Sequence, residues 1–175
     1  ASNENPHGPS PKAVEAIREA AAEVHHYPKS VHADLTDALA DEWQVNPQQI
    51  WLANGGDGAL DYLARAMLDP SESVLVPTPG FAYYGMSARF HHGEVNEYPV
   101  RQDDAFALTP DAVLDAYDGE RIVYLTSPHN PTGGRFTLDE IETIGDETQE
   151  DTLLVVDEAY GEFEEGPSAR ELLAE

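Results

Sequence analysis

Short apolar runs alternate with helix-forming segments along most of the chain. We expect strands at residues 50–53, 73–76, 94–98, 121–125 and 152–156. We expect helices at residues 33–43, 60–67, 81–90, 109–117 and 138–148. Parallel strands need long crossover connections and are covered on both faces, so their runs are apolar throughout. The alternation therefore predicts an α/β fold, a three-layer α/β/α sandwich around a mostly parallel sheet.

The first part of the chain has a different character. Proline and glycine punctuate residues 1–9 and predict an extended arm. Ser10 and Pro11 then have the order of an N-cap followed by the first helical position, and they predict a helix there. Tyr27-Pro28 interrupts the chain after this helix. We therefore divide the chain into an arm with the first helix, residues 1–26, and a main domain, residues 27–175.

A dispersed negative charge limits the partners that we expect. The sequence has 34 acidic and 9 basic residues and a net charge of −25 at pH 7, without a terminal acidic block. Such a surface repels nucleic acids and anionic membranes, so we expect neither as a partner. Its composition resembles proteins of salt-loving archaea. We predict that stability rises with salt, which screens the repulsion; a merely acidic protein from a non-halophile is the alternative.

The sequence gives no sign of a metal site, a disulfide or a membrane-spanning segment. There are no cysteines, which excludes disulfides and thiolate metal sites. The pairs His25-His26 and His91-His92 lack carboxylates at a metal-ligand spacing, and we interpret them as solvated or packing side chains. The sequence has no apolar run of membrane-spanning length and no apolar signal segment, so we expect a cytoplasmic protein.

Three motifs follow predicted strands, where open α/β sheets bind their ligands. Residues 54–58 (Asn-Gly-Gly-Asp-Gly) open a helix, and their backbone N–H groups suit an anion; a tight turn capped by Asp57 is the alternative. Residues 127–133 (Ser-Pro-His-Asn-Pro-Thr-Gly) are also compatible with a plain turn. Asp157 ends the most apolar strand and needs a partner, either a protonated pyridine nitrogen or an arginine.

The order of these motifs, with three others, resembles fold-type-I pyridoxal-phosphate (PLP) aminotransferases, and among them the histidinol-phosphate aminotransferases. The other three are residues 2–11 (Ser-Asn-Glu-Asn-Pro-His-Gly-Pro-Ser-Pro), Tyr27-Pro28 and residues 77–84 (Pro-Thr-Pro-Gly-Phe-Ala-Tyr-Tyr). Residues 157–160 (Asp-Glu-Ala-Tyr) complete the last motif. The resemblance covers essentially the whole chain and about the first half of such an enzyme. It implies the large PLP-binding domain of that fold.

The resemblance also implies roles for individual residues. The implied cofactor-binding residues are Gly55, Gly56, Asp57, Phe81, Asn130, Asp157, Tyr160 and, from the partner subunit, Tyr27. The amides of Gly56 and Asp57 would cradle the phosphate, and Phe81 would stack on the pyridine ring. The implied catalytic residues are Asn130 and Tyr160, which would hydrogen-bond the phenolic oxygen, and Asp157, which would keep the ring nitrogen protonated.

Substrate and partner assignments follow from the resemblance in the same way. Asn5 and Gly8, in the arm, would lie near the substrate, and the shared Tyr27 implies a homodimer. The implied reaction is transamination of L-histidinol phosphate with 2-oxoglutarate, in histidine biosynthesis. A threonine-phosphate decarboxylase and a non-catalytic domain on the same scaffold are the alternatives.

Several positions depart from the family pattern. Gly58 stands where Glu is usual, and His129 where Asn is common. Phe81 and Tyr84 fit an aromatic-x-x-Tyr pattern only with one residue inserted before them. No lysine follows Lys29, and neither it nor Lys12 suits the Schiff-base role that the chemistry requires. We therefore expect the chain to be the N-terminal half of an enzyme and, alone, to be inactive and to bind PLP weakly.

Overall fold

The computed structural model describes residues 3–27 and 33–173. Contacts group the chain into two units, residues 2–53 and residues 54–175. Pro28 and Lys29 of the motifs above lie outside the described residues. The predicted division after residue 26 stays a prediction.

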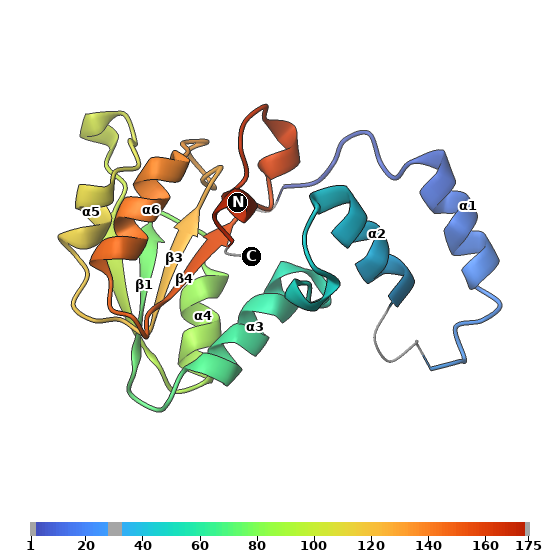
Figure 1. The fold of residues 1–175 in the computed structure, drawn as a ribbon, viewed down its shortest axis with the longest axis horizontal. Coiled ribbons are helices and arrows are strands. Elements are labelled where there is room, and N and C mark those ends of the chain that lie inside the picture. Colours follow the sequence, from blue (N-terminus) through green and yellow to red (C-terminus); the bar gives the residue numbers. More distant parts are fainter. Residues whose placement is uncertain (1–2, 28–32, 174–175) are drawn as a thin grey trace. The chain divides into compact units, whose positions relative to one another are not determined.

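Four parallel strands form the sheet of the larger unit (Figure 1). They are β1 (Ser73–Thr78), β2 (Glu94–Pro99), β3 (Ile122–Thr126) and β4 (Leu153–Asp157). Their order is β2-β1-β3-β4, and every neighbouring pair is parallel. Four of the five predicted strands are thus confirmed, with ends shifted by one or two residues.

The fifth predicted strand, residues 50–53, is wrong. This segment follows the short 3-10 helix η1 (Pro47–Gln49) and has no strand partner in the described chain. Trp51 within it is 59% exposed. A four-residue apolar run has the composition of a strand, but it forms one only where a neighbour accepts and donates its backbone hydrogen bonds.

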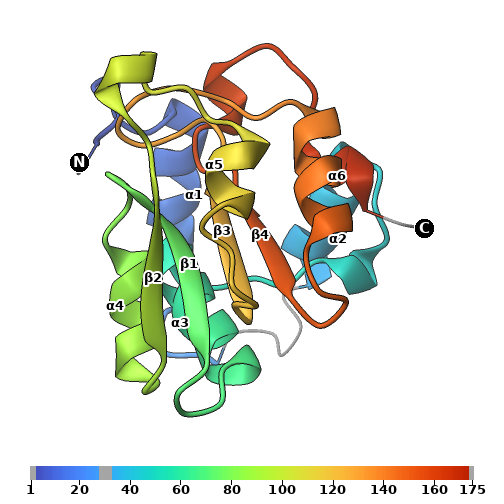
Figure 2. The same ribbon diagram turned by 90° about the vertical axis from the view of Figure 1, so that its left-hand side faces the viewer.

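Helices cover both faces of the sheet (Figures 1 and 2). On one face lie α3 (Gly55–Met67) and α4 (Tyr83–Phe90), and on the other α5 (Pro110–Leu114) and α6 (Leu138–Glu147). Side chains of β1 and β3 alternate between the two resulting cores, as the pleat requires. Val74, Val76, Ile122 and Tyr124 pack with α3 and α4, whereas Leu75, Val123 and Leu125 pack with α5 and α6. The predicted three-layer α/β/α architecture is confirmed.

Capping residues set the helix starts that the sequence indicates. Thr109 accepts the Ala112 N–H at 3.2 Å and begins α5, which ends at Leu114, before the predicted Tyr117. Thr137 and Glu140 form a capping box at the start of α6. The other 3-10 helices of this unit are η2 (Gln102–Asp104), η3 (Gly161–Phe163) and η4 (Ala169–Leu172).

The smaller unit contains α1 (Pro11–Ala20) and α2 (Ala33–Trp43). Ser10 caps α1 by accepting the Ala13 N–H at 3.2 Å, as predicted. The preceding arm is not extended throughout. Asn5 accepts the His7 N–H at 3.0 Å through its side chain and the Gly8 N–H at 3.2 Å through its carbonyl. This Asx turn shows that the local hydrogen bonds of asparagine outweigh the extended preference of the flanking prolines.

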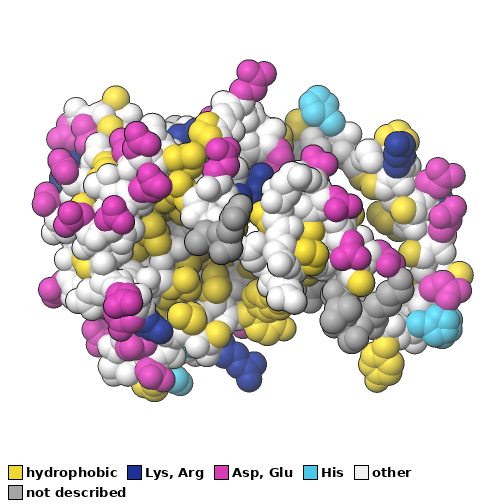
Figure 3. All heavy atoms as spheres, in the orientation of Figure 1, with side chains coloured by type: hydrophobic (Ala, Val, Ile, Leu, Met, Phe, Trp, Pro, Cys, Tyr) yellow, Lys and Arg dark blue, Asp and Glu magenta, His cyan; other side chains and the backbone are white. Residues whose placement is uncertain are grey.

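Acidic side chains are scattered over the visible face rather than gathered in a block (Figure 3). This agrees with the dispersed charge in the sequence. Within the described residues, no helix has the length and apolar character needed to cross a membrane.

Candidate functional site at the carboxyl edge of the sheet

The strand order reverses direction between β1 and β3, which is where open α/β sheets bind their ligands. From β1 the chain crosses to β2 on one side, while β3 and β4 follow on the other. At such a reversal the loops beyond the carboxyl ends diverge to opposite faces and leave a crevice. The loop after β1 contains Phe81, the loop after β3 contains Asn130, and β4 ends at Asp157. Three of the predicted site residues therefore share this edge.

The Asp157 carboxylate is held by two donors. Its Oδ2 accepts a hydrogen bond from the Tyr84 hydroxyl at 2.6 Å, and its Oδ1 accepts one from the Ala159 N–H at 2.9 Å. Its backbone carbonyl accepts the Ser127 N–H at 2.9 Å, which ties the β4 end to the loop after β3. The sequence left an arginine open as partner; among the described residues the partner is instead a tyrosine.

Tyr84 is fixed by its surroundings in α4. It is fully buried, its ring stacks on Tyr124 with centroids 4.7 Å apart, and Phe81 meets it edge-on at 5.4 Å. Its hydroxyl also hydrogen-bonds Thr126 at 2.9 Å. Burial, and then the Asp157 charge, raise the pKa of Tyr84 far above its ordinary value. The residue therefore remains a hydroxyl donor at any physiological pH.

The loop after β3 is a closed, largely buried turn. The His129 N–H donates to the Gly134 carbonyl and the Gly133 N–H to the His129 carbonyl, both at 2.7 Å. Gly133 has a φ of 80°, which favours glycine. Nδ1 of His129 lies 2.7 Å from Thr132 Oγ1. Burial lowers the pKa of His129, opposed by the nearby Pro79 carbonyl, so its ring is neutral at pH 7.

Within this turn Asn130 is 8% exposed and held by the backbone around it. The plain-turn interpretation and the ligand interpretation of residues 127–133 are thus compatible. The turn is the device that holds one amide side chain at the strand edge.

The N-terminus of α3 is open. Asn54 occupies the N-cap position but makes no side-chain capping bond. Gly55 has a φ of 71°, and a Cβ built on Gly55 or Gly56 would meet no atom within 4 Å. The sequence alternative, a turn capped by Asp57, is not what forms, because Asp57 lies inside the first turn of the helix. Backbone N–H groups at an uncapped helix start, with the helix dipole behind them, suit an anion.

The remaining predicted residues take no part in the site contacts described above. Tyr160 is half-buried at the N-cap of η3, three residues after Asp157. The centroids of the Tyr160 and Phe163 rings are 6.4 Å apart. Tyr27, Asn5 and Gly8 belong to the smaller unit, and Tyr27 is fully exposed. Their roles at the site stay predictions.

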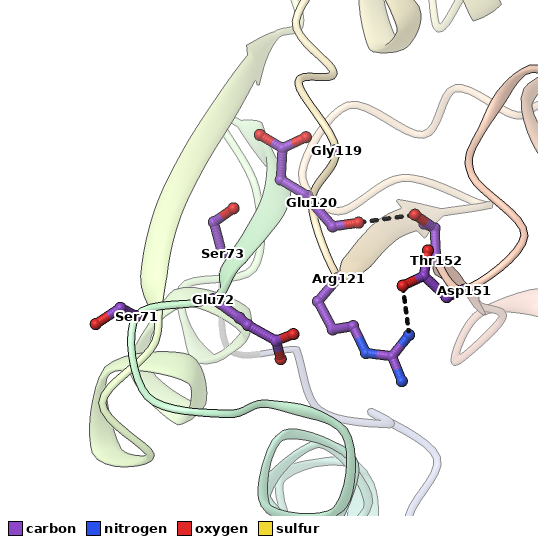
Figure 4. Close-up of a pocket in the computed structure, with 8 residues that line it drawn as sticks. All are labelled: Ser71, Glu72, Ser73, Gly119, Glu120, Arg121, Asp151 and Thr152. Atoms are coloured by element: carbon purple, nitrogen blue, oxygen red, sulfur yellow. Dashed lines mark hydrogen bonds and ion pairs between the residues drawn. The ribbon is translucent and has the colours of Figure 1, made fainter.

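A polar hollow lies at the opposite, amino-terminal edge of the sheet (Figure 4). Its polar groups bind one another: Arg121 donates to the Met67 carbonyl at 3.2 Å and lies 3.9 Å from Asp151, and Thr152 donates to the Glu120 carbonyl at 2.9 Å. The buried Glu120 carboxylate accepts bonds from Asn96 and from the Asp118 N–H. These contacts anchor the loops that enter the strands, and we assign this edge a structural role.

Comparison with known proteins decides the family. The sequence pattern of "Aminotransferase class I and II" matches residues 1–175. The chain belongs to this aminotransferase family. The predicted resemblance is confirmed.

Curated relatives of this aminotransferase chain include histidinol-phosphate aminotransferases of salt-loving archaea. That of Halobacterium salinarum is 74% identical over 169 residues, which is 96% of this chain and 46% of the relative. That of Haloarcula marismortui is 69% identical over 175 residues, 100% of this chain and 49% of the relative. The chain spans about half the length of the curated relatives it matches.

Solved structures confirm the fold-type-I architecture. The histidinol-phosphate aminotransferase of Sinorhizobium meliloti, in complex with pyridoxal-5'-phosphate, superposes with a TM-score of 0.84 at 29% identity. The match covers 92% of this chain and 44% of that one. A Thermus thermophilus aspartate aminotransferase gives a TM-score of 0.73 at 28% identity, over 83% of this chain and 43% of that one.

Tyr84 and Thr126 had no role in the sequence-based prediction. Tyr84 belongs to the motif at residues 77–84, but only Phe81 in that motif was assigned a function. The available signal was the spacing of three residues between two aromatics next to a helix start, with Phe81 just before α4 and Tyr84 in its first turn.

Proposed function

We propose that the carboxyl edge of this sheet binds PLP and that the chain forms the cofactor-binding part of an aminotransferase. The observation that supports this most is the Asp157 carboxylate. It is oriented by Tyr84 and the Ala159 N–H and has no ion pair with a basic side chain among the described residues. A protonated pyridine nitrogen would supply the opposite charge that a partly buried carboxylate needs.

The open start of α3 supports a phosphate site. The N–H groups of Gly55, Gly56 and Asp57 are free of a side-chain cap, and the glycines leave space for an anion to approach. The phosphate and the ring nitrogen are the two ends of PLP. An anion site and a carboxylate on one unit therefore match the charges at both ends of the cofactor.

The ring itself would meet Phe81, Asn130 and Tyr160. Phe81 packs edge-on against the buried Tyr84, which limits its movement as a stacking surface. Asn130 is held within a closed turn, and Tyr160 follows Asp157 by three residues. Both side chains offer donors to the phenolic oxygen of the cofactor.

When bound, PLP supplies an electron sink for the charge that develops at the substrate Cα. The chain maintains that capacity through its own groups. Asp157 holds the proton on the ring nitrogen, and Asn130 and Tyr160 hydrogen-bond the phenolic oxygen. The α3 N-terminus holds the phosphate and so fixes the position of the ring.

The amino donor in this proposal is L-histidinol phosphate, the amino acceptor is 2-oxoglutarate, and the pathway is histidine biosynthesis. The names of the relatives, at 74% and 69% identity, support the donor. The acceptor follows from the family resemblance.

A cytoplasmic homodimer with shared sites is part of the same proposal. The fully exposed Tyr27 ring supports it, since such a side chain is available to a partner subunit. The Asn5–Gly8 turn would approach the substrate from the arm, with residues 1–26 serving as arm and first helix.

The test is an assay of a full-length enzyme that contains this chain. We expect 2-oxoglutarate to be converted to glutamate in the presence of L-histidinol phosphate, and no CO2 release from threonine phosphate. CO2 release without glutamate formation would replace the aminotransferase by the decarboxylase. Absence of both reactions from a folded, PLP-saturated protein would favour a non-catalytic domain.

A further inference from the structure

We propose that Tyr84, supported by Thr126, is a positioning residue that orients the Asp157 carboxylate toward the cofactor's ring nitrogen. This inference rests on the proposed function. It concerns a side chain 73 positions away in sequence, on α4 rather than on a strand-end loop.

The direction of each hydrogen bond follows from the available protons. Tyr84 has one hydroxyl hydrogen and donates it to Asp157 Oδ2 at 2.6 Å. The Tyr84 hydroxyl oxygen also lies 2.9 Å from Thr126 Oγ1. Because the tyrosine hydrogen is already used, the threonine hydroxyl must be the donor in this second hydrogen bond. The result is a directed chain in which Thr126 donates to Tyr84 and Tyr84 donates to Asp157. Such chains polarise each member and strengthen the last bond.

The chain is anchored where it cannot easily relax. Tyr84 and Thr126 are 0% and 2% exposed, and Thr126 pairs with Asp157 in the β3–β4 register. The Tyr84 ring lies between Tyr124, which stacks on it, and the edge contact with Phe81. The donor hydroxyl is thus fixed relative to both the strand end and the proposed stacking surface.

The effect on Asp157 follows from its own flexibility. The terminal torsion of an aspartate is broad, so the carboxylate plane turns readily unless donors hold both oxygens. Tyr84 holds Oδ2 and the Ala159 N–H holds Oδ1. Each oxygen keeps one further acceptor position, which leaves room for the pyridinium N–H.

Removing the hydroxyl has two consequences with the same sign. An untethered carboxylate pairs less well with the ring nitrogen, and a carboxylate that has lost a donor attracts a proton more strongly. Both effects shift the proton away from the nitrogen. Without the tyrosine hydroxyl, the carboxylate must also lose conformational freedom when PLP binds. We expect this cost to weaken PLP affinity by about 2- to 12-fold.

The test compares Tyr84→Phe with Tyr98→Phe in the full-length holoenzyme, reconstituted with PLP labelled with 15N in the ring. Tyr98 is an equally buried tyrosine whose hydroxyl donates to the Tyr124 carbonyl at 3.0 Å and does not contact Asp157. Both variants keep the ring and lose one buried hydroxyl, which makes two hydrogen bonds in Tyr84 and one in Tyr98. Circular dichroism and thermal melts establish that both fold.

We expect the 15N chemical shift of Tyr84→Phe to move toward the unprotonated value, whereas Tyr98→Phe matches the wild type. Thr126→Val should move it in the same direction by less. A Tyr84→Phe shift equal to that of Tyr98→Phe would overturn the inference while leaving the proposed function intact. If the 15N chemical shift is the same in Asp157→Asn as in the wild type, the proposed function is overturned instead.

Discussion

Replacing Gly56 by alanine should stabilise the fold and weaken cofactor binding at the same time. A Cβ at Gly56 meets no atom within 4 Å, and its φ is not positive, so the folded chain accepts the methyl group without strain. The unfolded chain loses freedom, which is worth about 0.4–1 kcal/mol in favour of folding. For a chain of this size that gain corresponds to a rise in Tm of about 1–4 °C.

The same methyl group would stand at the proposed phosphate site. Cβ atoms of a helix tilt toward its N-terminus, so the methyl group that Gly56→Ala introduces points to the side from which the anion approaches. Loss of one charge-assisted hydrogen bond costs about 1.5–3 kcal/mol, or roughly 10- to 150-fold in PLP affinity. The affinity for pyridoxal, which lacks the phosphate, should change little.

Gly145→Ala is the matched control for this prediction. It lies in α6, its added Cβ would make an ordinary contact with Leu154 at 3.8 Å, and it is remote from the proposed site. Thermal melts and PLP titrations of the full-length enzyme compare the two variants. The reasoning is refuted if Gly56→Ala and Gly145→Ala bind PLP equally well, or if Gly56→Ala lowers the affinities for PLP and for pyridoxal by the same factor.

Three further predictions concern charge, protonation and covalent chemistry. With a net charge of −25, the Tm should rise between low and molar KCl, and equal values at both ends would contradict the halophilic interpretation. Burial lowers the pKa of His129, so below about pH 6.5 the unfolded state binds more protons than the folded state. The free energy of unfolding should therefore fall between pH 7.5 and pH 5.5, and it should fall less in His129→Asn. Urea melts across this pH range measure both. Borohydride treatment of the 175-residue chain with PLP should trap no adduct, and mass spectrometry that located one on Lys12 or Lys29 would contradict this.

The layered fold was predictable because each strand carries its own signal. β1, β3 and β4 are largely apolar runs separated by helices, and burial on both faces requires that composition. Residues 50–53 carry the same signal without a partner strand, and pairing is a tertiary property that a short run does not encode. The boundary of α5 was missed for a related reason, since Tyr117 packs against the core from a turn rather than from a helix.

The site was predictable only as separate pieces. Strand-end position and family motifs indicated Asp157 and Asn130, because these lie next to local sequence signals. The Tyr84–Asp157 contact joins α4 to β4 across 73 residues, and no local pattern specifies which buried tyrosine reaches a given carboxylate. The parallel register that brings Thr126 beside Asp157 is equally a property of the assembled sheet.

The central claim is that Asp157 is the ring-nitrogen partner in an aminotransferase site. Stopped-flow absorbance of the full-length holoenzyme, mixed with L-histidinol phosphate alone, measures the half-reaction that converts the cofactor to its amine form. We predict that Asp157→Asn slows this conversion by about 100-fold or more, as loss of a preorganised charge does. Asp151→Asn, in the turn two residues before the start of β4, should leave the rate unchanged. Equal rates for Asp157→Asn and the wild type would contradict the account.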